Sequence, residues 1–212
     1  MATELPTLET ARRNLVAIGR AFDARGWVPA TSGNFSSRLR SGVIAITASG
    51  GHKGRLADAD IITVNAQGQS RDGGRPSAET VLHLQIYRLF PEAGAVLHTH
   101  SPGGVALSRA FPDLEAWTIQ GHELLKALPD HTTHDASVTL PIVANSQDMQ
   151  ALAATVEPRL TATPSPPAYL IRGHGLYAWG RDVAEAERVV EALEWLFAAD
   201  LTERQYRAGA PA

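Results

Sequence analysis

The chain has 212 residues, a net charge of −3 at pH 7 and no cysteine. This length suits one domain with a substantial core, which we expect to span residues 1–212. The net negative charge does not indicate the positively charged surface with which proteins bind nucleic acid or acidic membranes. The lack of cysteine excludes disulfides and thiolate metal ligands. The expected partner is therefore a small molecule.

Segment 1–22 lacks the apolar core and the cleavage site of a signal peptide. No later run approaches the roughly 20 apolar residues that a membrane-spanning helix needs. We therefore expect a cytoplasmic protein that has no membrane partner.

Strand and helix patterns alternate along the chain. Apolar residues at helical spacing predict a first helix over 7–25, which Gly26 would end. Short β-rich runs predict strands at 42–47 and 61–64, and Ser77 is the expected N-cap of a second helix. The remaining elements are predicted strands at 93–98, 137–143 and 168–180, the last split by a Gly-His-Gly turn, and predicted helices at 102–111, 146–160 and 182–203. We expect a mixed or largely antiparallel sheet with helices on both faces.

Two histidines, His98 and His100, end the apolar run in GAVLHTH. On a strand, this spacing places both side chains on one face, close enough to share a metal at about 2.0–2.1 Å from each nitrogen. The alternative is one hydrogen-bonded core histidine beside a surface histidine. A metal site needs a further ligand from elsewhere in the chain.

The third imidazole is His174, which follows a β-rich run and is flanked by Gly173 and Gly175. A lone histidine in such a turn is usually structural. Three protein ligands with an open position, however, are typical of a catalytic zinc site. The remaining histidines have weaker claims: His52, His83, His122, His131 and His134.

Two segments rich in glycine and hydroxyl residues, 31–39 and 47–56, adjoin strand-like runs. Their backbone N–H groups and hydroxyls can surround a phosphate, and Lys53 can add a positive charge. Either segment alone is more simply an ordinary turn. Ser77 can add a hydroxyl at the positive end of a helix dipole. Together with the histidines, these segments indicate a metal enzyme acting on a phosphorylated substrate.

Taken in order, six segments resemble the class II aldolase/adducin family: TSGNFSSRL, ITASGGHKGRL, PSAET, VLHTHSPGG, GHELLKAL and RGHGLYAWG. The resemblance implies an α/β fold, namely an αβα sandwich with a central, mostly antiparallel sheet flanked by helices. It implies one zinc ion per subunit, bound by His98, His100 and His174. It also implies a substrate-phosphate site made of Ser32, Gly33, Asn34, Ser49, Gly50, Lys53 and Ser77.

The sequence departs from the sugar-phosphate aldolases of this family at one position. Those enzymes typically have Pro-Ser-Ser-Glu, whereas Ala78 replaces the second serine here. This difference favours the family's dehydratases of methionine salvage, as does Glu123, which matches their acid/base glutamate. The alternative for Glu123 is a solvated helix residue. The role of Glu79 stays open between a fourth metal ligand and a bystander.

The resemblance to these dehydratases implies zinc-dependent loss of water from 5-methylthioribulose 1-phosphate, which gives 2,3-diketo-5-methylthiopentyl 1-phosphate. Glu123 is then expected to take the C3 proton and to protonate the departing C4 hydroxyl. The nearest alternative is a sugar-phosphate aldolase or 4-epimerase. The alternative outside the enzymes is an adducin-like binding module without catalysis. Because family members are commonly tetramers with active sites near subunit contacts, we expect a homo-oligomer, most simply a homotetramer.

Overall fold

The computed structural model describes residues 4–209, so the ends of the expected domain, 1–3 and 210–212, lie outside the described residues. The strands are β1 Asn34–Arg38, β2 Ile44–Thr47, β3 Ile61–Val64, β4 Ala95–Thr99, β5 Ala116–Gln120, β6 Ser137–Val143, β7 Ala168–Ile171 and β8 Gly175–Gly180. The α-helices are α1 Leu8–Ala24, α2 Thr80–Leu89, α3 Pro102–Ala110, α4 Met149–Ala162 and α5 Val183–Gly209. Short 3-10 helices are η1 Lys53–Arg55, η2 Asp58–Asp60 and η3 Glu123–Ala127.

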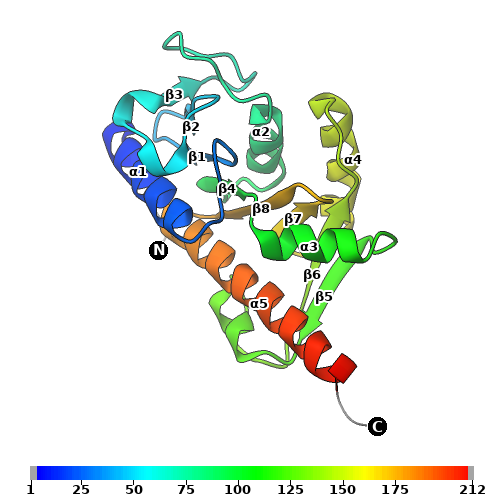
Figure 1. Ribbon diagram of the computed structural model, residues 1–212. Helices are drawn as coiled ribbons and strands as arrows, with labels where there is room; N and C mark the ends of the chain where they lie inside the picture. Colours follow the sequence, from blue (N-terminus) through cyan, green and yellow to red (C-terminus); the bar gives the residue numbers. More distant parts are fainter. Residues whose placement is uncertain (1–3, 210–212) are drawn as a thin grey trace.

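The eight strands form one sheet in the order β3-β2-β1-β4-β8-β7-β6-β5. The pairing of β6 with β7 is parallel, and every other pairing in this sheet is antiparallel. Figure 1 shows α1 and α5 on one side of the sheet and α2 and α4 on the other. This arrangement confirms the expected α/β fold with a mostly antiparallel sheet between helices. The sequence had not separately predicted β1 and β5.

Side chains alternate between the two faces of the sheet, as the pleat requires. On β4, Ala95 and Leu97 join the apolar cluster that packs on α1 and α5, whereas Val96 joins the cluster under α2 and α4. Each fully buried aliphatic side chain contributes about 1.5–3 kcal/mol to folding. By the same alternation, His98 points to the side of α2 and α4. The position of β4 between β1 and β8 therefore brings His98 to the middle of the sheet.

Side-chain oxygens cap the starts of α1, α4 and α5. The Asp182 side chain accepts the N–H of Glu185 at 2.8 Å at the start of α5. The expected Ser77 cap is wrong, because α2 begins at Thr80 with Glu79 at its N-cap position. The Ser77 hydroxyl instead accepts the N–H of Glu79 at 3.2 Å in the turn before the helix. Over the described range, no helix combines the length and the apolar character that crossing a membrane requires.

Candidate functional site

Three histidine side chains converge at one end of the central strands. His98 is in β4, His100 follows that strand, and His174 lies in the turn between β7 and β8. One ring nitrogen of each histidine lies within 4.8 Å of the others, so the three could hold one metal ion. The fold therefore brings together the three histidines predicted from sequence, although His98 and His174 are 76 residues apart along the chain.

The ring of His98 is held in one tautomer. Its Nδ1 lies 3.0 Å from the carbonyl oxygen of Leu176, which can only accept, so Nδ1 carries the hydrogen. Burial lowers the pKa of His98 well below its usual value, so the ring is neutral and its Nε2 presents a lone pair. That Nε2 lies 2.9 Å from Nε2 of His100, whose pKa burial lowers to about 4. Neutral imidazoles with converging nitrogens are the form that binds a divalent metal.

A glycine lets the strand that carries Leu176 lie close to His98. A Cβ at Gly175 would meet the carbonyl oxygen of Thr99 at 2.0 Å and the His98 ring at 3.1 Å. Gly33 has a comparable constraint, because its φ is +73° and a Cβ would lie 2.7 Å from the carbonyl of His98. The histidine strand is thus packed tightly against backbone on two sides.

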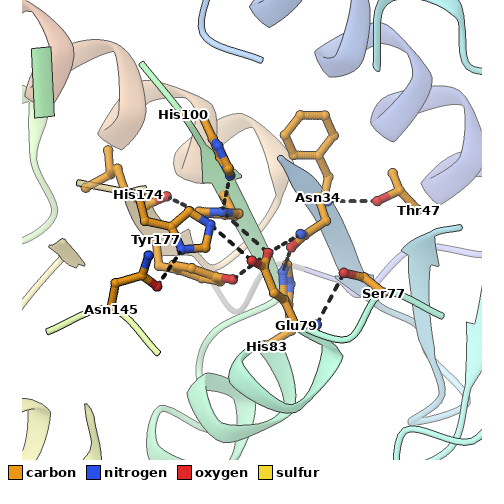
Figure 2. A network of polar contacts seen from close by, with 12 residues as sticks. Asn34, Thr47, Ser77, Glu79, His83, His100, Asn145, His174 and Tyr177 are labelled. Carbon is orange, nitrogen blue, oxygen red and sulfur yellow. Dashed lines mark hydrogen bonds and ion pairs between the residues drawn. The ribbon is translucent and has the colours of Figure 1, made fainter. Parts of the chain in front are cut away.

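Glu79 lies among the three imidazoles. Its Oε1 is 3.1 Å from Nε2 of His174, and its Oε2 is 3.4 Å from Nε2 of His98. Burial alone would raise the pKa of Glu79, but the neighbouring imidazoles and the Asn34 amide hold it well below its usual range. Figure 2 shows His174 and Tyr177 directed at this carboxylate. A fixed anion thus faces the space that the histidine nitrogens surround.

Aromatic rings stack behind the histidines. Tyr177 lies flat on His98, with ring centroids 4.0 Å apart and an angle of 16° between the planes. Tyr169 continues the stack on the other face of Tyr177, at 5.1 Å and 6°. The Tyr177 hydroxyl donates to Oε2 of Glu79 at 3.0 Å. The three rings come from adjacent strands, whose register aligns His98 with Tyr177 and Tyr177 with Tyr169.

A cavity of about 320 Å³ adjoins the histidines. All seven residues predicted to hold phosphate line it, as do Glu79 and His100; the seven are Ser32, Gly33, Asn34, Ser49, Gly50, Lys53 and Ser77. Among the described residues, the buried Ser32 Oγ has no hydrogen-bond partner, which is unusual for a hydroxyl in a folded chain. Such an orphaned donor beside hydroxyls and glycines fits an anionic ligand.

Lys53 places an ammonium at this cavity from η1. Its Nζ donates to the carbonyl oxygens of Gly51 at 2.7 Å and Thr31 at 3.0 Å. Burial lowers the pKa of Lys53, and the nearby Glu79 charge opposes that shift. The two carbonyls hold the ammonium in place without neutralising it. The ammonium thus adds a positive charge to the cavity.

Glu123 lies apart from this cluster in the described chain. Its side chain is 74% exposed on η3 and binds Nζ of Lys126 at 2.6 Å. The hydrogen bond from Lys126 lowers the pKa of Glu123. None of the described contacts of the three histidines involves Glu123. The fold therefore brings together the predicted metal and phosphate residues, but it does not add Glu123 to them within one chain.

Sequence reasoning did not connect Asn34, His83 and Tyr177 with Glu79, although all four belong to the polar network in Figure 2. The side chain of Asn34 contacts Glu79 and His83, whereas the sequence had grouped Asn34 with phosphate ligands. His83 had been set aside as a histidine with a weak claim. Tyr177 was part of a predicted strand without a role. The spacing of four residues between Glu79 and His83, typical of neighbours on one helix face, was the one sequence signal that could have linked His83 to Glu79.

Comparisons with known proteins give the family of the chain and relatives that it resembles. The family described as Class II Aldolase and Adducin N-terminal domain matches residues 13–201. A methylthioribulose-1-phosphate dehydratase of Methylococcus capsulatus is 52% identical over 198 residues, covering 93% of this chain and 95% of that protein. One of Acidiphilium cryptum is 49% identical over 201 residues, covering 94% of each chain. The structure of l-fuculose-1-phosphate aldolase from Thermus thermophilus has a TM-score of 0.75 and 28% identity, covering 95% of this chain and 97% of that one.

Proposed function

Because the chain belongs to the class II aldolase and adducin family, as its motifs predicted, we propose that it dehydrates methylthioribulose 1-phosphate. The observation that carries this proposal is the cavity beside the histidines, which joins an anion-binding lining to a three-imidazole group. A phosphorylated ketose has a phosphate at one end and adjacent carbonyl and hydroxyl oxygens near it. The site offers partners for both.

The phosphate would bind in the cavity around Lys53. The free hydroxyl of Ser32 would donate to a phosphate oxygen, and the Lys53 ammonium would balance part of the charge. Ser49, Gly50 and Ser77 would complete the cradle with hydroxyls and backbone N–H groups. Bound in this way, the substrate would direct its carbonyl end to His100, which lines the same cavity.

The metal would be zinc, held by His98, His100 and His174. The donor set fits it, because three imidazoles with an open side are a known catalytic zinc arrangement. Bound zinc would act as a Lewis acid on the substrate's carbonyl and neighbouring hydroxyl oxygens. Glu79 would supply a carboxylate beside the ion, and Tyr177 would hold that carboxylate in place.

Dehydration requires one group that moves a proton. A carboxylate removes the proton from C3. The C4 hydroxyl takes up a proton, the C4–O bond breaks and water leaves. The enol that remains tautomerises to the 2,3-diketone. Glu123 would take the first proton and give it back to the leaving hydroxyl, so that the carboxylate ends the cycle unchanged.

Glu123 would act in the site of a neighbouring copy. Its exposed position on η3 leaves it accessible to another subunit, whereas His98, His100 and His174 of its own chain are not among its contacts. This assignment requires a homo-oligomer, for which a tetramer is the expected form. Mixing Glu123→Gln chains with His98→Ala chains should then restore activity, because hybrid sites combine an intact glutamate with an intact histidine.

The decisive measurement is turnover of methylthioribulose 1-phosphate by zinc-loaded protein, with the diketone product followed directly. We expect Glu123→Gln to lower kcat about 100-fold or more while zinc content is unchanged. Glu115→Gln is the matched control, since this carboxylate is also exposed and ion-paired, with Arg159. Near-normal turnover by zinc-loaded Glu123→Gln would remove Glu123 from the mechanism.

A sugar-phosphate aldolase is the second candidate, and the similarity to the Thermus thermophilus aldolase structure favours it. Aldol cleavage would begin from the same bound ketose but would remove the proton from the C4 hydroxyl. Against it, Ala78 lines the cavity rim where the aldolases were expected to have a second serine. Release of dihydroxyacetone phosphate from fuculose or rhamnulose 1-phosphate would support the aldolase.

A further inference from the structure

A chain of buried hydrogen bonds runs from Tyr87 to Glu79, and the proposed function uses only its last members. The Tyr87 hydroxyl lies 2.8 Å from Oγ of Ser36, which lies 2.8 Å from Nδ1 of His83. Nε2 of His83 contacts Oδ1 of Asn34. Nδ2 of Asn34 donates to Oε2 of Glu79 at 2.5 Å. Each of the four residues behind Glu79 is less than 10% exposed.

The orientation of Asn34 follows from its two neighbours. The Glu79 carboxylate accepts hydrogen bonds, so the Asn34 amide must turn its NH₂ group toward it. A flipped amide would place two acceptor oxygens against each other. The amide oxygen of Asn34 therefore faces His83 and can only accept from it.

The tautomer of His83 follows from Asn34. Because Oδ1 of Asn34 accepts, Nε2 of His83 carries the ring hydrogen. Burial lowers the pKa of His83 to about 4, so the ring is neutral near pH 7 and has only this one N–H. Nδ1 of His83 then accepts from the Ser36 hydroxyl, and Ser36 accepts from the Tyr87 hydroxyl. All four hydrogen bonds point the same way, toward Glu79.

The chain stabilises the carboxylate with neutral donors alone. An arginine or lysine at the position of Asn34 would compete with a metal ion for the Glu79 oxygens, whereas an amide does not cancel their charge. The bond from Asn34 also fixes the rotation of the carboxylate, because it binds Oε2 and leaves Oε1 beside His174. A hydrogen-bonded partner of this kind sets the direction of a metal-site group.

We propose that His83 is a positioning residue for the metal site. In the Nε2–H tautomer it orients the amide of Asn34, and Asn34 in turn orients the Glu79 carboxylate toward the three histidines. The consequence for turnover rests on the proposed function, whereas the tautomer and its effect on metal affinity do not. The first two measurements below therefore decide the inference even if the substrate is a different one.

The tautomer is read directly by nitrogen NMR of the full, zinc-loaded chain labelled with ¹⁵N-histidine. The His83 signals are assigned by their absence from His83→Gln. We expect a protonated Nε2 and a bare Nδ1 from about pH 6 to pH 8. An Nδ1–H tautomer, or a cationic ring within that range, overturns the inference.

Two substitutions test the positioning role. The side chain of His83→Gln can place an amide N–H where the ring has its Nε2–H, whereas His83→Leu has similar bulk and no donor. We expect His83→Gln to bind zinc within a few-fold of the parent chain and His83→Leu about 10–100-fold more weakly, by competition with a chelator. Equal zinc affinities in the two variants overturn the positioning role. If His83→Leu does not fold, the NMR tautomer of the parent chain still decides.

Turnover gives a third readout. With saturating zinc, we expect His83→Leu to lower kcat for methylthioribulose 1-phosphate about 10-fold or more while KM changes little, because the Ser32 hydroxyl and the Lys53 ammonium, which would hold the phosphate, lie outside this hydrogen-bond chain. His83→Gln should recover most of that loss. A lowered Tm with unchanged kcat in both variants would mean that His83 is only a packing residue. No turnover by the parent chain would instead count against the proposed function and leave the first two measurements to decide.

Discussion

The carbonyl oxygen of Leu176 accepts the Nδ1–H of His98 at 3.0 Å, and this one contact decides which nitrogen of the ring is free. Leu176 belongs to β8, and His98 belongs to β4 beside it. The strand pairing therefore prepares Nε2 of His98 as a ligand before any ion binds.

Removing the His98 ring should abolish metal binding. We expect the zinc content of His98→Ala to fall from about one ion per chain to a small fraction of that, because two imidazoles remain. Elemental analysis of purified protein measures it. His131→Ala is the control, since that ring binds the carbonyl of Pro129 and should leave the metal content unchanged. Full zinc content in His98→Ala would show that the ion binds elsewhere.

We expect Ser32→Ala to weaken substrate binding without lowering the stability of the folded chain. The Ser32 hydroxyl is buried without a partner in the described chain, which costs folding about 1–3 kcal/mol. Its removal should therefore leave Tm unchanged or raised, while KM for the phosphorylated substrate rises about 2- to 10-fold through one lost hydrogen bond. Kinetics and thermal unfolding of Ser32→Ala beside the exposed Ser41→Ala test both effects. A lowered Tm with unchanged KM would give Ser32 a structural role.

Gly175→Ala should disturb the metal site through the backbone. A methyl group there would sit 2.0 Å from the Thr99 carbonyl, so β8 must move away from β4. We expect a loss of about 1–3 kcal/mol in the free energy of unfolding and weaker zinc binding. Gly209→Ala is the matched control, because a Cβ there meets nothing within 4 Å. Denaturant unfolding gives the difference, and equal stability of both variants would contradict the crowding argument.

Glu194 should make stability depend on pH. Its carboxyl is buried against Ser101, whose hydroxyl lies 2.5 Å away, and burial raises the pKa of Glu194 to about 7. From its usual pKa of 4.5 up to about 7, the native chain holds a proton that the unfolded chain has lost. Stability therefore falls as pH rises through this window, by roughly 3 kcal/mol, and is constant above it.

Glu194→Gln removes this ionisation. The variant should gain stability over the parent chain as pH rises from 5 to 8, because its side chain has no proton to lose. Urea unfolding at the two pH values measures the change. Parallel pH dependence in parent and variant would show that Glu194 ionises in the native chain at its ordinary pKa.

The elements and the histidine group could be predicted from sequence because their signals are local. Helical spacing predicted α1 and α5, and the spacing of His98 and His100 predicted a shared face. Two strands escaped detection for different reasons. β1 begins at Asn34, inside a segment whose glycine and hydroxyl residues resemble a turn, and β5 is a short run with only two buried positions.

The partners of Glu79 could not be predicted, because they meet only in the folded chain. Asn34 lies 45 residues away and Tyr177 lies 98 residues away. Their contact depends on β1, β4 and β8 being neighbours, which no local pattern specifies. Within one chain Glu123 is exposed, which agrees with the alternative of a solvated helix residue that the sequence left open.

The stacked rings of His98, Tyr177 and Tyr169 restrict which parts of the site can change in evolution. Its rings stand on paired central strands, where a slip of one residue would turn every ring to the opposite face. The cavity that would bind the phosphate is lined instead mostly by residues of the loops before β1, after β2 and before α2. Substrate preference can therefore change through loop substitutions, whereas the position of His98 and of the two rings behind it can change only with the register of the central strands.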